Sequence, residues 1–434
     1  MFDKKSFNIQ DAFKLAIKNH VNKKFKEAKK LYSEILKIKP DHANVLNNLG
    51  EIFRAEGETA KAKICYEKAI ETNPNLASAF NNLGLIYSKN KDKFKAKDLF
   101  IKAVDLDSNF ANPNYNLGII YKELGDYKKA KIFYEKVIKI NSNHADTYNN
   151  LAIINEELGE TQNARKNYNK AIEINPKHIN ALWNSHVLAF DIDEALSILR
   201  RINDIDKQNI KSRILISALE SYKGNFELYN NLLNSEHSNH PYTRSIKWIF
   251  SLSKLPKIFF NRWGFFDEMI SLCDSSRPFY EFGVWNGVSF NYLIKTFKKG
   301  FGFDTFTGIP ETWHNEPVGN YSNFGAVPNI EGGEFIVGKF EDTLPKFFLK
   351  KRPIASLINF DADLYSSTIC ALNFSKQIID EKTILIFDEF IMNNNWEKDE
   401  YKALNEFCNN FGFNYEVLAF SLSTKQVAIK IKKN

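Results

Sequence analysis

The sequence predicts two parts of different fold class: an all-α solenoid of helical repeats, followed by an α/β domain built on a doubly wound parallel sheet. Two observations carry this prediction. In the first half of the chain, a pattern of small and aromatic residues returns every 34 residues. In the second half, short apolar runs alternate with helical pattern and end in acidic residues, as expected of parallel strands covered by helices on both faces.

The composition is that of ordinary globular protein with more than one domain. The chain has 434 residues, of which 44% are hydrophobic and 26% charged, which excludes disordered and fibrous classes. The net charge of +7 comes from lysines spread along the chain, which indicates a solvated surface and no nucleic-acid partner. No window holds the ~20 apolar residues of a membrane span.

We expect a cytoplasmic protein, because the first residues lack the apolar core of a signal peptide. The four cysteines, Cys65, Cys273, Cys370 and Cys408, are isolated in the sequence. They are expected to be reduced thiols and not disulfides or zinc ligands.

Five repeats keep one register in the N-terminal half. The positions that recur are a small residue, an aromatic four residues later, a glycine or alanine in the first helix, and a proline or serine before the loop. They are Ala28, Ala62, Ala96, Ala130 and Ala164; Tyr32, Tyr66, Phe100, Tyr134 and Tyr168; Ala16, Gly50, Gly84, Gly118 and Ala152; and Pro40, Pro74, Ser108, Ser142 and Pro176. This pattern resembles the tetratricopeptide repeat, in which small residues let two antiparallel helices approach and the aromatic fills the gap. Stacked repeats form a solenoid with a concave face.

An asparagine ladder follows the same period at Asn48, Asn82, Asn116, Asn150 and Asn184. It is similar to the ladder of O-linked N-acetylglucosamine transferase, which implies that the amides face the groove and bind the backbone of an extended peptide or protein, including a glycan-bearing one. An amide offers both donor and acceptor, so it can pair with any peptide backbone. Alternatively, these asparagines only cap or solvate helices in an asparagine-rich chain.

The predicted organisation has three segments. Residues 7–205 form the solenoid, residues 206–256 form a helical capping or linker segment outside the repeat register, and residues 257–434 form the α/β domain. The capping segment contains His237 and His240, for which a polar loop is favoured over a metal site.

The α/β domain begins with the stretch FYEFGVWNG, from Phe279 to Gly287. It reads as an apolar strand ending in Glu281, then a turn through Gly283, Asn286 and Gly287 into a helix. Such a turn presents backbone N–H groups to a ligand, although an ordinary strand-to-helix turn has the same appearance. Asp304 ends the next strand, from which a carboxylate can reach ribose hydroxyls.

The turn resembles motif I of class I S-adenosylmethionine-dependent methyltransferases, which implies a Rossmann-like sheet closed by a reversed edge hairpin. Four further phrases, GFDTFTGIPETW, FEDTLP, NFDADLYSST and IFDEF, resemble the macrocin O-methyltransferase family in the family's order. That resemblance implies an S-adenosylmethionine-dependent and Mg²⁺-dependent enzyme that methylates sugar hydroxyls. It assigns Glu281, Gly283, Asn286, Gly287 and Asp304 to the cofactor.

The same resemblance places the metal carboxylates at Asp361, Asp388 and Glu389, the last being aspartate in macrocin-type sequences. Acids at adjacent strand ends also repel one another unless a cation or protons neutralise them, and Mg²⁺ would lower the pKa of a bound hydroxyl. Alternatively, the acids only cap a loop and a helix. Asp363 is a candidate acid or base.

His314 is a candidate base near neutral pH. The alternative is that it is a histidine of a surface loop without a catalytic role. Trp396 and Glu400 are expected beside the substrate mouth, or packed in a helix. The function predicted from the sequence is therefore Mg²⁺-assisted O-methylation of a small-molecule or glycan acceptor, with a repeat array for partner or substrate. The alternatives are an interaction scaffold with an inactive methyltransferase-like domain, and methyl transfer to a protein side chain.

Overall fold

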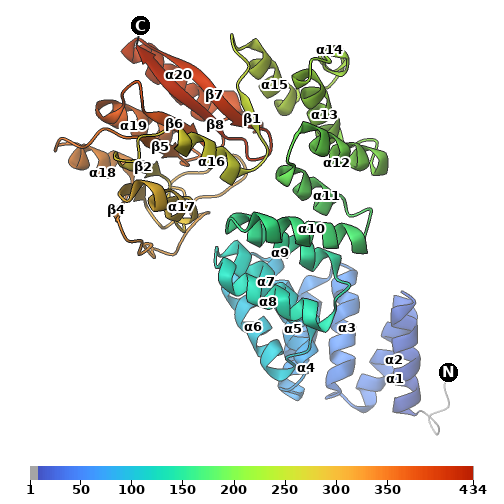
Figure 1. Ribbon diagram of the computed structural model, residues 1–434. Coiled ribbons are helices and arrows are strands. Elements are labelled where there is room, and N and C mark those ends of the chain that lie inside the picture. Colours follow the sequence, from blue (N-terminus) through green and yellow to red (C-terminus); the bar gives the residue numbers. More distant parts are fainter. Residues whose placement is uncertain (1–7, 434) are drawn as a thin grey trace. The chain divides into compact units, whose positions relative to one another are not determined.

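The structure is a computed structural model that describes residues 8–433 (Figure 1). It contains two compact units, one ending at Ile154 and one beginning at Asn155. Each unit is described by itself.

The first unit consists of antiparallel helix pairs. They are α1 (Ile9–Val21) with α2 (Phe25–Ile38), α3 (Ala43–Ala55) with α4 (Thr59–Thr72), α5 (Ala77–Lys89) with α6 (Lys93–Leu106), α7 (Ala111–Glu123) with α8 (Tyr127–Ile140), and then most of α9 (Ala145–Glu157). Short turns join the helices, so neighbouring helices in sequence are neighbours in space (Figure 1).

The registered glycines set how closely the helices of a pair approach. A Cβ built on Gly118 would lie 2.4 Å from the ring of Tyr134, and on Gly50 or Gly84 it would lie 2.6 Å from the aromatic ring of the same repeat. These rings are buried: Tyr134 is 0% exposed. The predicted role of small residues and aromatics is therefore confirmed, because the ring occupies the volume that a side chain at the glycine would need.

Gly118→Ala is expected to destabilise the array by about 1–3 kcal/mol, since it overpacks a filled core. Thermal unfolding followed by far-ultraviolet circular dichroism measures the effect. Tyr134→Leu in the same background removes the ring atoms and should restore part of the loss, which a double-mutant cycle quantifies. An unchanged melting curve for Gly118→Ala would contradict this packing.

The second unit begins with helices. They are α10 (Thr161–Ile174), α11 (Ile179–Ser185), the 3₁₀ turn η1 (His186–Leu188), α12 (Ile192–Ile205), α13 (Ile210–Tyr222), α14 (Glu227–Leu233) and α15 (Pro241–Ser251). The side chain of Trp248 in α15 packs against Phe390 and Trp396, and Arg244 forms an ion pair with Glu397. These helices share a continuous hydrophobic core with the sheet that follows, across the boundary predicted near residue 256. The limits predicted for the three segments, at residues 7–205, 206–256 and 257–434, stay a prediction.

An eight-stranded mixed sheet forms the rest of the second unit, in the order β1-β7-β8-β6-β5-β2-β3-β4. Its strands are β1 (Lys257–Phe259), β2 (Phe279–Phe282), β3 (Gly300–Asp304), β4 (Gly333–Val337), β5 (Leu357–Phe360), β6 (Ile384–Phe387), β7 (Phe413–Ser421) and β8 (Val427–Lys433). Strands β4, β3, β2, β5 and β6 are parallel, whereas β8 is antiparallel to both β6 and β7. The arrangement is compatible with the predicted α/β domain.

Side chains alternate between the two faces of the sheet, as period-2 strands require. Phe279 of β2 packs with α16 (Arg262–Ser271) and α17 (Val288–Phe297). The next residue, Tyr280, belongs to the core on the other face, with α18, α19 and α20. Those helices and the nearby 3₁₀ turns are α18 (Phe340–Phe347), α19 (Tyr365–Ser375), η2 (Lys376–Ile378), η3 (Trp396–Lys398) and α20 (Glu400–Phe411).

The sheet differs from the prediction at one edge. The closing hairpin of β7 and β8 was expected at the edge, but β1 pairs in parallel with β7 and takes the edge position. Strand β1 has only three residues, Lys257–Phe259, which is too short for a periodic signal.

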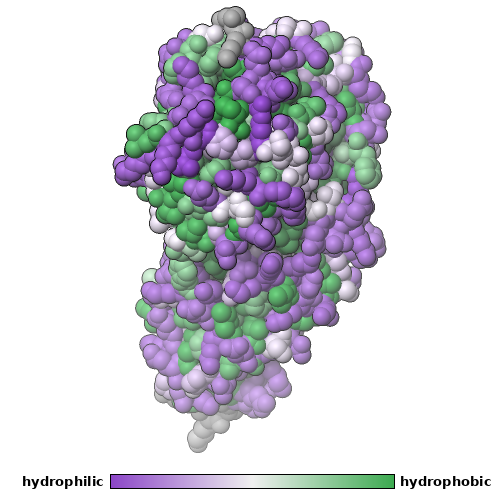
Figure 2. All heavy atoms as spheres, turned by 60° about the vertical axis from the view of Figure 1, so that its left-hand side comes forward, coloured by the Kyte–Doolittle hydropathy of each residue, from purple (hydrophilic) through white to green (hydrophobic). Residues whose placement is uncertain are grey.

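Among the described residues, none of the helices combines the length and apolar character that crossing a membrane requires. On the face shown in Figure 2, hydrophobic residues are interspersed with hydrophilic ones. Scattered exposed apolar side chains of this kind are normal on a protein surface.

Candidate functional site

The turn after β2 is held in left-handed backbone conformations. Gly283 has φ +89° and Gly287 φ +78°, and Trp285 between them has φ 49°. A Cβ on Gly283 would lie 1.8 Å from the backbone oxygen of Asp361. Glycine is therefore required at 283 both by the backbone conformation and by the close approach of the segment after β5.

This turn lies where the order of the sheet reverses. The chain proceeds from β2 to β3 and β4 on one side and then returns to β5 and β6 on the other. In open α/β sheets, ligands bind beyond the carboxyl ends of the strands at such a point. Gly283 after β2 and Asp361 after β5 are the residues at this position.

Asp304 closes the turn from the end of β3. Its Oδ2 accepts hydrogen bonds of 2.7 Å from the backbone N–H groups of Val284 and Trp285, and its Oδ1 accepts one of 2.6 Å from Phe306 N. Asp304 as a residue is only partly buried. Asp304 thus fixes the turn while part of its surface stays accessible to a ligand.

Glu281 is 0% exposed and lies on β2, directly before the turn. Its Oε1 accepts hydrogen bonds from Ser289 Oγ at 2.5 Å and from Asn359 Nδ2 at 2.8 Å, which tie β2 to α17 and β5. Burial raises the pKa of this carboxyl to about 8, and the two donors only partly offset that effect. The structure places Glu281 inside the protein, although the prediction assigned it to the cofactor.

Asn286 has an unsatisfied donor at the turn. Its Oδ1 accepts a hydrogen bond from Val288 N, whereas its buried Nδ2 has no partner among the described residues. An unpaired buried donor is costly unless a further molecule accepts from it. Together with the accessible carboxylate of Asp304, it fits a ligand that presents hydroxyl groups, as the ribose of a nucleoside cofactor does.

The segment between β3 and β4 covers the turn. A Cβ on Gly287 would meet Pro328 and Ile330 at 3.1–3.3 Å, and the ring of Trp285 lies 6.2 Å from that of Tyr321. This segment brings His314, with a left-handed backbone at φ 49°, to within 3.0 Å of Asp399. Asp399 was not predicted from the sequence, because it lies 85 positions from His314.

Acidic side chains gather at the ends of β5 and β6. Burial, followed by repulsion from Asp388 and Asp363, raises the pKa of Asp361 well above its usual range. Burial, followed by repulsion from Glu389 and Asp388, does the same for the pKa of Asp363. Asp363 also has a left-handed backbone at φ 59°, which costs conformational energy and is common at functional sites.

Glu400 at the start of α20 belongs to the same cluster. It is 0% exposed, and neither carboxylate oxygen has a partner among the described residues. Burial, followed by repulsion from Asp363 and Asp388, raises its pKa well above the usual range. The sequence prediction placed Glu400 beside the substrate mouth but did not recognise it as part of the acidic cluster.

Two predicted metal carboxylates are paired with protein cations. Asp388 accepts a 2.6 Å hydrogen bond from Gln426 and lies 3.3 Å from the guanidinium of Arg262. Glu389 accepts 2.7 Å hydrogen bonds from Lys425 Nζ and Asn393 Nδ2. Within residues 8–433, no group of three or more His, Cys, Asp or Glu side chains is arranged to hold a metal ion. The pairing of Asp388 and Glu389 with cations therefore does not fit the predicted Mg²⁺ at Asp361, Asp388 and Glu389.

The asparagine ladder joins neighbouring repeats. Asn82 donates to Asn47 Oδ1 at 3.0 Å, and Asn116 donates to Asn81 Oδ1 at 3.1 Å. Asn150 continues the pattern by donating to Tyr115 Oη at 3.0 Å.

Each of these partners lies 35 positions earlier, one residue before the ladder position of the preceding repeat. Asn48, in α3 of the second helix pair, donates instead to Tyr32 Oη of α2 at 3.3 Å, and Asn184 lies in the second unit. The ladder amides thus stabilise the stack of repeats, and peptide binding through them stays a prediction.

Glu156 is a second buried acid, at the end of α9. Its Oε2 accepts a 3.0 Å hydrogen bond from Tyr168 Oη, and its backbone oxygen accepts one of 2.5 Å from Trp263 Nε1. Burial and the neighbouring Glu157 raise the pKa of Glu156 from its ordinary 4.5 to about 8. The carboxyl therefore keeps its proton in the folded state at pH values where the unfolded chain has lost it.

The stability of the second unit is expected to fall as pH rises from about 4.5 toward 8, because the folded state binds a proton that the unfolded state does not. Glu156 contributes a slope of up to about 1.4 kcal/mol per pH unit. Glu156→Gln removes this contribution, so the variant should gain stability over wild type as pH rises.

Urea unfolding followed by tryptophan fluorescence measures this unit alone, since all six tryptophans follow Ile154. Glu173→Gln, at an exposed acid of α10, is the control. Parallel pH curves for wild type and Glu156→Gln would refute the assignment.

Comparisons with known proteins identify the repeats. Three family models match, described as tetratricopeptide repeat at residues 109–177, TPR repeat at residues 50–91 and tetratricopeptide repeat at residues 77–110. The N-terminal part of the chain is therefore a tetratricopeptide repeat array, a class that generally binds peptides or proteins and indicates an interaction scaffold. The matches do not reach the C-terminal sheet, and no curated protein matches the chain.

Three solved structures are similar to part of this chain. PilF of Pseudomonas aeruginosa is 20% identical, with a TM-score of 0.44 over 49% of this chain and 97% of that one. YrrB, described as a TPR protein with an unusual peptide-binding site, is 22% identical, with a TM-score of 0.37 over 44% and 97%. MamA is 27% identical, with a TM-score of 0.34 over 37% and 95%.

Proposed function

We propose that the C-terminal domain is an S-adenosylmethionine-dependent methyltransferase that acts on a hydroxyl, of a saccharide or glycoconjugate, and that the repeat array binds the partner that carries or delivers the substrate. The observation that carries the proposal is the turn at the reversal of the sheet. There, an accessible carboxylate, Asp304, and an unpaired buried donor, Asn286, meet at a glycine turn. The order of the strands supports a Rossmann-like domain of this class.

Residues of the glycine turn and the end of β3 would bind the proposed cofactor. Asp304 and the side-chain amide of Asn286 would hold ribose hydroxyls, and the shape of the turn depends on Gly283 and Gly287. When bound, S-adenosylmethionine supplies a methyl group on a positively charged sulfonium. The acids after β5 and β6 favour a positive charge at this edge of the sheet.

His314 and Asp399 provide the base. Asp399 lies 3.0 Å from His314 Nε2, which orients the ring and places its proton on that nitrogen. Nδ1 is then the acceptor for the proton of the substrate hydroxyl. Loss of that proton would leave the hydroxyl oxygen with the electron pair needed to take the methyl group that bound S-adenosylmethionine would supply.

Formation of S-adenosylhomocysteine tests this function. The full chain is incubated with S-adenosylmethionine and a panel of hydroxyl acceptors, including mono- and oligosaccharides, with and without added Mg²⁺. Product that depends on an acceptor supports the proposal, and Mg²⁺-stimulated turnover would restore the metal prediction that the described geometry does not support.

A scaffold with an inactive methyltransferase-like domain is the second candidate. The pairing of Asp388 with Arg262, and of Glu389 with Lys425, favours it, because internal cations already neutralise two acids of the site. Binding of S-adenosylmethionine without turnover on any acceptor would support this reading.

A further inference from the structure

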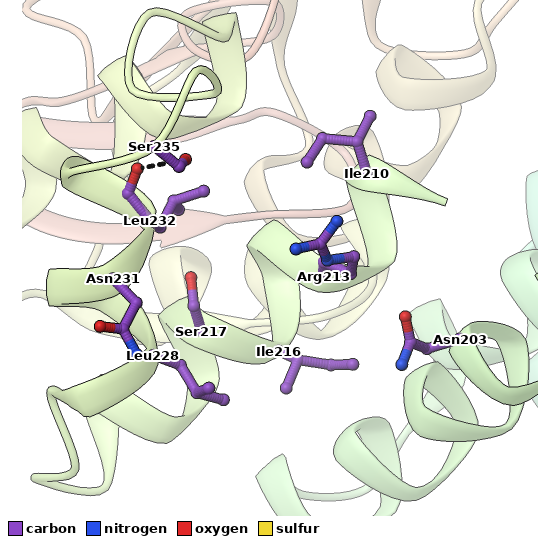
Figure 3. Close-up of a pocket in the computed structure, with 9 residues that line it drawn as sticks. All are labelled: Asn203, Ile210, Arg213, Ile216, Ser217, Leu228, Asn231, Leu232 and Ser235. Carbon is purple, nitrogen blue, oxygen red and sulfur yellow. Dashed lines mark hydrogen bonds between the residues drawn. The ribbon is translucent and has the colours of Figure 1, made fainter. Parts of the chain in front are cut away.

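A pocket lies among helices α12, α13 and α14, outside the residues matched by the repeat models (Figure 3). Its volume is about 330 Å³, at the lower end of the range for ligand sites. It is lined by Asn203, Ile210, Arg213, Ile216, Ser217, Leu228, Asn231, Leu232 and Ser235. A space of this size suits one or two amino-acid residues and not a large ligand.

The polar part of the pocket has unused hydrogen-bonding groups. The side chain of Arg213 is exposed and forms no ion pair or hydrogen bond with the described residues. By contrast, Arg200 on α12 pairs with Glu220, and Arg244 on α15 pairs with Glu397. An unpaired guanidinium beside a pocket is a preferred partner for a carboxylate.

Asn203, across from α13 in Figure 3, supplies an acceptor. Its side-chain oxygen is buried and has no donor among the described residues. A buried acceptor of this kind is unfavourable unless an N–H or O–H group reaches it. The pocket therefore favours a ligand that brings a donor as well as a carboxylate.

The remaining wall is aliphatic. Ile216 of α13 and Leu228 and Leu232 of α14 line the pocket, and Leu228 is 44% exposed. Covering this surface with an apolar side chain is favourable because it removes apolar area from water.

We infer that this pocket binds the C-terminal residue of a partner protein, an aliphatic residue with its free carboxylate. Such a residue carries all three complementary groups on one Cα: a carboxylate for Arg213, a backbone N–H for Asn203 and an apolar side chain for the aliphatic wall. A fatty acid offers the carboxylate and the apolar body but no donor for the buried oxygen of Asn203. The site is separate from the methyltransferase proposal and does not depend on it.

Fluorescence polarisation of the full chain with a labelled glycine–serine peptide ending in leucine tests this inference. The peptide with a free carboxylate is expected to bind roughly tenfold or more tightly than its C-terminal amide, the effect of one charge-assisted contact. Arg213→Gln should remove that difference, and Asn203→Ala should weaken binding of both peptides. Because Arg213 is exposed, its replacement should leave the unfolding curve unchanged.

Arg201→Gln is the matched control, since Arg201 is an exposed arginine of α12 that does not line the pocket. It should bind both peptides as wild type does. Equal binding of acid and amide, or no effect of Arg213→Gln, would overturn the inference. Decanoate is the competitor. If decanoate displaced the peptide and bound more tightly than the peptide, the inference would also be overturned, because the pocket would then be a site for an acyl chain.

Discussion

Gly283→Ala is expected to destabilise the second unit by about 3 kcal/mol or more and to abolish binding of S-adenosylmethionine. Two costs add at this position. The backbone has φ +89°, which side chains disfavour, and the new Cβ would lie 1.8 Å from the backbone oxygen of Asp361. Because that oxygen belongs to the main chain after β5, it cannot move without separating β2 from β5. Urea unfolding followed by tryptophan fluorescence measures the loss.

Gly412→Ala separates the two costs. Gly412 ends α20 with φ +67°, and nothing lies within 4 Å of a Cβ built there. This variant should lose only about 1–2 kcal/mol, the cost of the left-handed conformation. If both variants lost the same stability, the close approach at Gly283 would not be the constraint that we infer.

His314→Gln is expected to lower the rate of methyl transfer about 10²- to 10⁴-fold, the usual contribution of a general base. Affinity for S-adenosylmethionine should be unchanged, because His314 lies on the segment that covers the turn and not in the turn itself. Asp399→Asn should lower the rate less, since the ring would lose its charged partner but keep its acceptor nitrogen.

The control for His314 is His237→Gln, in the polar loop before α15. The measurement is S-adenosylhomocysteine formation against pH for each variant. A rate for His314→Gln equal to that of wild type would remove His314 from the mechanism and leave the acids after β5 as candidate bases.

The repeat array was predictable from the sequence because each structural requirement recurs. Gly118 and Tyr134 make the same contact as Gly50 and Tyr66, so one geometric constraint appears several times at a fixed spacing. The asparagine ladder was found in the same way. The partners of the ladder amides were not predicted, because only the stacking of repeats places Asn47 and Asn81 beside Asn82 and Asn116.

The candidate site was predictable only in part. Strand ends and glycine turns are local features, so Gly283, Asp304 and Asp361 were located from the sequence. The partners of the acids depend on contacts between distant segments, such as Arg262 with Asp388, which are 126 positions apart. No periodic pattern reports such a contact, so the sequence predicted acids available to a metal where the structure shows acids paired with cations.

Burial also changed the expected roles. Glu281 stands at the position that the resemblance assigns to the cofactor, but its carboxylate is enclosed by Ser289 and Asn359. A sequence gives the position of an acid along a strand. It does not give the side-chain packing that decides whether the acid faces a ligand or supports the turn.

Calorimetric titration of S-adenosylmethionine into the full chain tests the central claim most directly. We expect saturable binding of one molecule per chain in the micromolar range, weakened by Asn286→Ala, which removes the unpaired donor at the turn, and unchanged by the pocket variant Arg213→Gln. Absence of binding by a folded chain, shown by a normal unfolding curve, would contradict the methyltransferase proposal and leave the repeat array as the functional part of the protein.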